Sequence, residues 1–101
     1  MKKPLKIGII GLGVGEAHLK SYKNISNVEV ISVCDIDPQR LSFIGNKYDV
    51  RGRYLDSKKI TEDPNIDIVS ICSYDNYHAE QLLSAFRNGK HVMVEKPVVL
   101  F

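Results

Sequence analysis

The chain alternates short, nearly continuous apolar runs with longer stretches in which apolar residues recur at helical spacing. Short runs rich in β-branched residues are typical of buried strands, and the longer stretches are typical of amphipathic helices. The pattern predicts strands over residues 5–10, 28–34, 52–55, 66–72 and 91–94. It predicts helices over residues 16–25, 37–48, from 56 or 57 to just before 63, and 78–88. Strands and helices therefore alternate from one end of the chain to the other.

Several positions define the predicted helices. Val14, Ala17, Ser21 and Ile25 form one stripe of the first helix, and Ala79, Leu82, Leu83 and Phe86 recur at helical spacing in the last. Asp37 is suited to cap the second helix, with Pro38 at its first position, and Gly89 is suited to end the last. Apolar strands joined by crossover helices predict an α/β fold with a parallel sheet covered on both faces.

Length and composition narrow the class of protein. A length of 101 residues predicts one domain, residues 1–101. The chain is 44% hydrophobic and 26% charged, which excludes a disordered, collagen-like or disulfide-framework protein. A net charge of +2 without a large basic cluster argues against a nucleic-acid partner. With no apolar run of about 20 residues and no signal-peptide pattern, we expect no membrane association and a cytoplasmic protein. Cys34 and Cys72 are expected to be reduced, buried thiols.

A glycine-rich turn separates the first strand from the first helix, and this context favours a Rossmann-type, doubly wound sheet with strand order 3-2-1-4-5. The turn consists of Gly11, Leu12, Gly13, Val14 and Gly15, all of which we assign to cofactor binding. Gly11 permits a tight turn, Gly13 admits a pyrophosphate close to the backbone, and the helix start offers unpaired N–H groups. The third glycine stands one position early, and Glu16 occupies its usual place and is expected to point outward. The alternative is that the three glycines only allow the chain to turn and bind no cofactor.

An acidic residue follows the second strand. Asp35 stands 24 residues after Gly11, close to the spacing of a ribose-binding acid, and Ile36 belongs to the same predicted cofactor site. A carboxylate accepts hydrogen bonds from ribose hydroxyls. It repels a 2′-phosphate, and the repulsion costs about 4 kcal/mol per unit charge at 4 Å and an effective dielectric constant of 20. NAD is therefore favoured over NADP. Arg40, also assigned to the cofactor site, is the alternative that would accept a 2′-phosphate.

The loop after the fourth strand lies beside the predicted ligand crevice, because the first and fourth strands flank the topological switch point. We assign Ser73, Tyr74, Asp75 and His78 from this loop to cofactor binding. For His78, a surface or capping role is the alternative. The histidines show no spacing typical of metal ligands, so no metal is expected.

A charged triplet follows the fifth strand at the same edge of the sheet. Glu95, Lys96 and Pro97 are assigned to cofactor binding, and Lys96 is the candidate catalytic residue. A lysine there hydrogen-bonds a ribose and polarises a substrate oxygen. Glu95 would hold Lys96, and a cis bond at Pro97 would aim it into the cleft. An ordinary charged turn is the alternative.

Four segments together resemble the N-terminal half of the glucose–fructose oxidoreductase / inositol dehydrogenase (Gfo/Idh/MocA) family. They are residues 7–13, 33–38, 73–80 and 89–97, and the last is the most specific because it ends in the Glu-Lys-Pro triplet. The glycine spacing is shorter than the family's, and Tyr74 stands where a proline is common.

The resemblance implies a nicotinamide-dependent oxidoreductase that acts on a sugar, a cyclitol or a sugar derivative. It implies that Lys96 touches the cofactor ribose and the substrate. It also implies a second α/β domain that supplies an aspartate and a histidine for proton transfer and through which homo-oligomers form. That domain is expected to be absent from residues 1–101, so we expect a fragment of a longer enzyme that binds dinucleotide weakly and has no activity alone. A stand-alone nucleotide-binding regulatory module and a ligand-free interaction domain are the alternatives.

Overall fold

The computed structural model describes residues 3–73 and 78–94, which form one parallel sheet and the helices that cover it. The strands are β1 Leu5–Ile10, β2 Val28–Cys34, β3 Gly52–Tyr54, β4 Ile68–Ile71 and β5 His91–Val94. The helices are α1 Leu12–Tyr22, α2 Pro38–Lys47, α3 Lys58–Thr61 and α4 His78–Arg87. The strands follow the order β3-β2-β1-β4-β5 with parallel pairing throughout, which confirms the predicted Rossmann-type topology.

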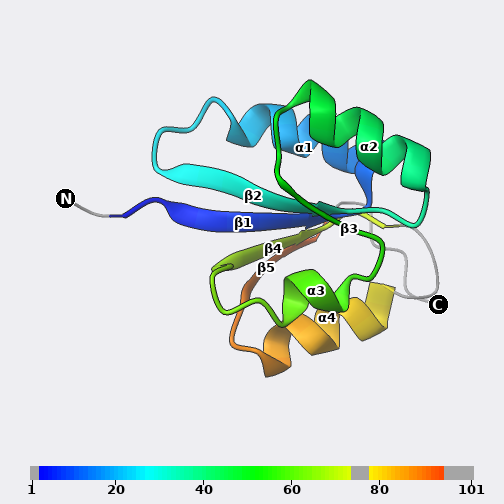
Figure 1. The fold of residues 1–101 in the computed structure, drawn as a ribbon. Helices are drawn as coiled ribbons and strands as arrows, with labels where there is room; N and C mark the ends of the chain where they lie inside the picture. The colour runs from blue at the N-terminus through cyan, green and yellow to red at the C-terminus, as the bar shows by residue number, and fades with distance from the viewer. Residues whose placement is uncertain (1–2, 74–77, 95–101) are drawn as a thin grey trace.

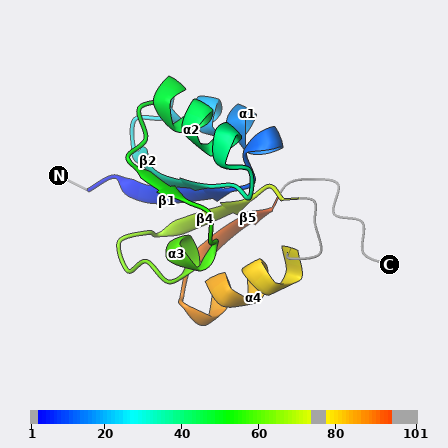
Figure 2. The ribbon, with the colours of Figure 1, turned by 45° about the vertical axis from the view of Figure 1, so that its right-hand side comes forward.

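The helices lie in two layers, with α1 and α2 on one face of the sheet and α3 and α4 on the other (Figures 1 and 2). Successive side chains of β1 point to opposite faces, so Ile9 packs in one core and Ile10 in the other. The first core also contains Leu19 and Ile44, and the second is centred on β4. Each fully buried aliphatic side chain contributes about 1.5–3 kcal/mol. Burial on both faces explains the nearly continuous apolar strands.

The first helix was predicted too late in the chain, at residues 16–25, whereas α1 begins at Leu12 and ends at Tyr22. Gly11 turns the chain immediately after β1, so the other turn glycines lie inside the helix. The predicted stripe is also wrong, because the buried residues of α1 are Leu12, Gly15 and Leu19 while Ile25 is exposed. The helical spacing could not be recognised from the apolar residues, because Gly15 lies on the buried face but has no apolar side chain.

The last helix has its predicted position, but its buried face differs from the apolar pattern. Leu83 and Phe86 are 54% and 59% exposed, while Gln81 and Ala85 are buried at 7% and 0%. Gly89 follows the helix with φ +72°, as expected of a C-terminal glycine. A polar side chain thus occupies a position where the pattern of α4 predicts none.

The remaining elements agree with the prediction to within a few residues. Asp37 caps α2 by accepting hydrogen bonds from the backbone N–H groups of Gln39 and Arg40. Cys34 and Cys72 are buried and form no disulfide, as predicted. Within residues 3–73 and 78–94, no helix has both the length and the apolar character needed to cross a bilayer.

Candidate cofactor-binding site

The carboxyl ends of β1, β2 and β4 meet at one edge of the sheet, where a cavity of about 750 Å³ opens. Ligands of open parallel sheets bind at this edge, beside the switch point between β1 and β4. Eight of the residues assigned from the sequence line the cavity: Gly11, Leu12, Gly13, Val14, Asp35, Ile36, Arg40 and Ser73. The fold therefore brings together residues that are up to 62 positions apart in the chain.

Two of the three turn glycines, Gly11 and Gly15, stand where a side chain would come too close to its neighbours. Gly11 has φ +89°, and a Cβ added there would lie 2.6 Å from the backbone nitrogen of Ser73. Gly15 lies behind the cavity, where an added Cβ would come within 2.9 Å of Ile9 Cγ2. The early third glycine therefore still permits close packing of helix on strand, the role that the third glycine has in this kind of turn. Gly13 is open, with only Arg40 Nη1 near an added Cβ, at 3.6 Å.

Two N–H groups of the first turn of α1 are available to a ligand. The Leu12 N–H donates to Asp35 Oδ2 at 2.8 Å, and the Gly15 N–H donates to the Gly11 carbonyl at 3.1 Å. The N–H groups of Gly13 and Val14 have no hydrogen-bond acceptor among the described residues, and both residues line the cavity. Free N–H groups at the positive end of a helix dipole fit an anionic diphosphate.

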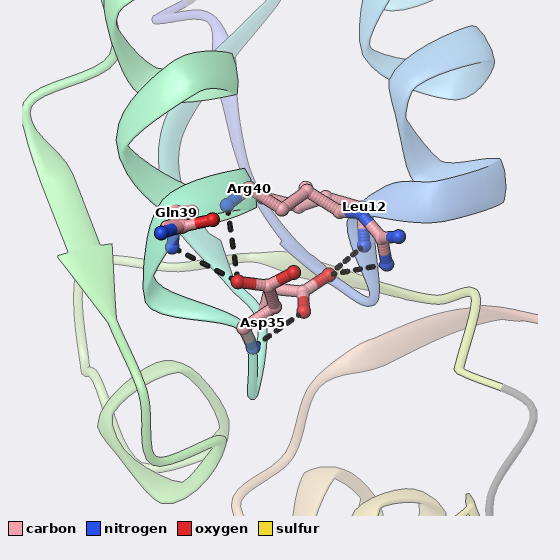
Figure 3. A network of polar contacts seen from close by, with 5 residues as sticks. Leu12, Asp35, Gln39 and Arg40 are labelled. Atoms are coloured by element: carbon pink, nitrogen blue, oxygen red, sulfur yellow. Dashed lines mark hydrogen bonds and ion pairs between the residues drawn. The ribbon is translucent and has the colours of Figure 1, made fainter.

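Asp35 lies in the cavity wall with both carboxylate oxygens engaged. It is 6% exposed; Oδ1 accepts from the Asp37 N–H at 2.8 Å, and Oδ2 accepts from Leu12. Arg40 Nη1 lies 3.8 Å from the same Oδ2, so the Leu12 amide and the Arg40 guanidinium meet one side of the carboxylate (Figure 3). A carboxylate has about four acceptor positions, which leaves capacity for ribose hydroxyls.

Burial and charge act on the thiol next to Asp35. Burial, and then the carboxylates of Asp35 and Asp56, raise the pKa of Cys34 to about 12. Cys34 is therefore a neutral thiol at physiological pH and not a nucleophile. Glu16 points away from the cavity, as expected, and accepts from Lys47 Nζ and the Tyr48 hydroxyl, each at 2.8 Å. In the described part of the chain, no cluster of three or more His, Cys, Asp or Glu side chains is arranged to hold a metal ion.

The β4 side of the cavity contains residues that the sequence analysis missed. Gln81 lines the cavity from α4, and its Oε1 accepts from Ser73 Oγ at 2.7 Å. Leu55, Asp56 and Ser57, which follow β3, line the opposite end. His78 is the first residue of α4, and its side chain lies outside the described part. Tyr74, Asp75, Glu95, Lys96 and Pro97 also lie outside the described residues.

Comparison with known proteins agrees with this geometry. Residues 5–100 match the model of the Gfo/Idh/MocA family, described as an oxidoreductase family with an NAD-binding Rossmann fold. The chain is 36% identical over 97 residues to myo-inositol 2-dehydrogenase of Thermotoga maritima, covering 95% of this chain and 29% of that protein. It is 34% identical to inositol 2-dehydrogenase of Salmonella typhimurium, covering 95% of this chain and 30% of that protein.

Solved structures agree with the sequence comparison. A probable dehydrogenase from Thermotoga maritima superimposes with a TM-score of 0.88 at 37% identity, over 92% of this chain and 28% of that one. Scyllo-inositol dehydrogenase from Lactobacillus casei, solved with NAD(H) and scyllo-inositol, gives a TM-score of 0.86 at 32% identity, over 94% of this chain and 28% of that one. The chain thus spans under a third of the length of these relatives. It belongs to the Gfo/Idh/MocA oxidoreductase family and corresponds to that family's NAD-binding Rossmann domain.

Proposed function

We propose that this protein binds NAD in the cavity and serves hydride transfer to or from a sugar, a cyclitol or a sugar derivative. The relatives reported above are dehydrogenases by name, and one was solved with NAD(H) and scyllo-inositol. When bound, the nicotinamide ring supplies the acceptor or donor of the hydride. The cavity observation that carries the proposal is the buried Asp35 carboxylate, bonded to the first N–H of α1.

The same carboxylate supports NAD over NADP. Two backbone N–H bonds fix Asp35, so its charge cannot turn away from a 2′-phosphate. Each unit of like charge at 4 Å costs about 4 kcal/mol at an effective dielectric constant of 20. The Arg40 side chain is 50% exposed and reaches Oδ2 only at 3.8 Å, so it offsets that repulsion in part.

The proposal extends to the assigned residues whose side chains lie outside the described part of the chain. Lys96 contacts the cofactor ribose and steadies the reacting substrate oxygen, and Glu95 and Pro97 position it. Tyr74 and Asp75 contact the cofactor from the segment between β4 and α4, and His78 does so from the start of α4. We assign the choice of substrate and the proton-transfer groups to the second domain that the family resemblance implies, since this chain spans under a third of the length of its relatives.

Equilibrium titration of the 101-residue chain with NAD, NADP and ATP tests the proposal. We expect NAD to bind about tenfold more tightly than NADP, and Asp35→Asn to weaken NAD binding about tenfold because one acceptor and the negative charge are lost. Asp37→Asn is the matched control, since asparagine caps a helix as well as aspartate and Asp37 does not line the cavity. Tighter binding of NADP would overturn the NAD assignment and show that Arg40 dominates. Binding of none of the three nucleotides would overturn the proposed function.

A further inference from the structure

Gln81 carries a buried amide whose hydrogen-bonding groups are satisfied only in part by residues 3–73 and 78–94. The residue is 7% exposed and lines the cavity from α4. Its Oε1 accepts from Ser73 Oγ at 2.7 Å. Its Nε2 has two N–H donors, and no acceptor bonds them among the residues that the structure describes. Buried polar groups are nearly always hydrogen-bonded, so this donor indicates a partner that enters the cavity.

The packing of α4 also indicates that the buried amide of Gln81 has a purpose beyond filling the core. The helix leaves Leu83 and Phe86 more than half exposed while it buries Gln81. Apolar burial alone favours the opposite arrangement. Ser84, the neighbouring polar residue of the cavity wall, pairs with Thr61 Oγ1 at 2.7 Å. Gln81 therefore differs from Ser84 in having a spare donor.

The position of Gln81 identifies the part of the ligand that it reaches. Its partner Ser73 lies against the glycine turn, since the Ser73 nitrogen is 2.6 Å from the position of a Gly11 Cβ. Ser73 follows β4, whereas Asp35 follows β2 on the other side of β1. A dinucleotide crosses the sheet at this point. With the adenosine on the β2 side, its diphosphate and second ribose lie toward β4.

We propose that Gln81 is a further cofactor-binding residue, whose Nε2 donates a hydrogen bond to the dinucleotide beyond its AMP half, at an oxygen of the second phosphate or of the ribose that follows. Ser73 acts as a positioning residue, because its hydroxyl fixes the orientation of the amide. The inference rests on the proposed function and adds a contact on the β4 side of the site.

Titration of Gln81→Met with AMP, ADP-ribose and NAD tests this contact. Methionine keeps the length of the side chain and removes the donor. We expect about tenfold weaker binding of ADP-ribose and NAD, the size of one lost hydrogen bond, and unchanged binding of AMP. Gln39→Met is the matched control, since Gln39 is exposed on α2 and does not line the cavity. Equal loss for AMP, or an unchanged affinity for NAD, would overturn the inference.

Thermal unfolding separates ligand contact from a structural role. If Gln81 serves only the fold, Gln81→Met lowers the Tm of the free chain and leaves the NAD affinity intact. If Gln81 serves the ligand, the free Gln81→Met chain has an unchanged or higher Tm, and the rise in its Tm on adding NAD is smaller than in the original chain.

Gln81→Glu provides a second variant if the methionine variant does not fold. It retains an oxygen for Ser73 but removes the amide donor, so it must also weaken NAD binding. Failure of the unsubstituted chain to bind NAD would overturn the proposed function itself, whereas normal NAD binding by both variants would overturn this inference alone.

Discussion

The two walls of the cavity differ in how far the protein satisfies its own polar groups. On the β2 wall, both oxygens of Asp35 accept backbone N–H bonds, and Arg40 lies beside the carboxylate. On the α4 wall, Gln81 bonds Ser73 through one amide atom and leaves the other without a partner among the described residues. Both side chains are buried to nearly the same degree, at 6% and 7% exposure. The difference therefore lies in hydrogen bonding and not in access to solvent.

This contrast separates a preformed wall from one that a ligand completes. The β2 wall is fixed before any nucleotide arrives, because Asp35 ties the start of α1 to the end of β2. Such preorganisation lowers the entropy lost on binding. On the α4 wall, the Gln81 amide has a donor that no residue in the described part of the chain accepts, so a ligand gains a hydrogen bond there without displacing a described group. Under the proposed function, adenosine recognition is thus built into the fold, and the second half of the dinucleotide supplies the partner of Gln81.

Replacing Gly11, which joins the two walls, is expected to have the largest effect. Gly11→Ala forces a Cβ to within 2.6 Å of the Ser73 nitrogen at φ +89°. Backbone strain and the clash together should lower the free energy of unfolding by about 3 kcal/mol or more. Urea denaturation followed by circular dichroism measures this change. A Gly11→Ala chain as stable as the original would contradict the close contact between the turn and β4.

Gly13→Ala is the matched control for that experiment. An added Cβ at Gly13 meets only Arg40 Nη1, at 3.6 Å, and alanine favours a helix over glycine by about 1 kcal/mol. Stability should therefore be retained or raised, while NAD binding should fall because a methyl group occupies the space in front of the free N–H groups. The two substitutions together separate a glycine needed by the fold from one needed by the ligand.

The two walls also differ in how well the sequence predicted them. Asp35 was identified because its place depends on short-range rules, namely the end of an apolar strand and a fixed distance from a glycine turn. The capping role of Asp37 followed from an equally local pattern. The strand order followed from the right-handed crossovers and the position of the glycine turn.

Gln81 was missed because its burial depends on how a whole helix packs. The apolar residues of α4 favoured a face with Leu83 and Phe86, yet Gln81 and Ala85 face the core. The start of α1 was missed for a related reason, since a helix that begins with glycines lacks the side chains that reveal its period. Tertiary packing decides both cases, and no local pattern contains it.

A moderate effect is expected on the titration of Cys34, whose thiol lies next to Asp35 in the β2 wall. Its pKa is raised from 9.0 to about 12, chiefly by burial and then by the charge of Asp35. Because the folded state favours the neutral thiol, this contribution to stability is complete below pH 9 and is lost as the pH rises toward 12. The Cβ chemical shift of Cys34, followed by carbon-13 NMR in a Cys72→Ala chain, measures the titration directly.

Asp35→Asn in the same background should bring the pKa of Cys34 down, because one of the two carboxylate charges that raise it is removed. Rapid alkylation of Cys34 near neutral pH in the folded chain would show instead that the β2 wall is open to solvent. An unchanged pKa after Asp35→Asn would show that the carboxylate is screened from the thiol.

The smallest effect is expected on the outer side of the β2 wall, where Glu16 links α1 to α2. Hydrogen bonds from Lys47 and Tyr48 lower the pKa of Glu16 below 4.5. The contribution to stability is therefore present above pH 4.5 and is lost as the pH falls through the lowered value. Glu16→Gln should lower the Tm by about 1–2 °C at neutral pH and by nothing in acid, since exposed ion pairs contribute little. Glu29→Gln is the control, because Glu29 is exposed and makes no side-chain hydrogen bond or ion pair with any described residue. NAD affinity should be the same for both variants, because Glu16 points away from the cavity. A weaker affinity in Glu16→Gln alone would mean that the shape of the β2 wall depends on the hydrogen bonds of Glu16 with Lys47 and Tyr48.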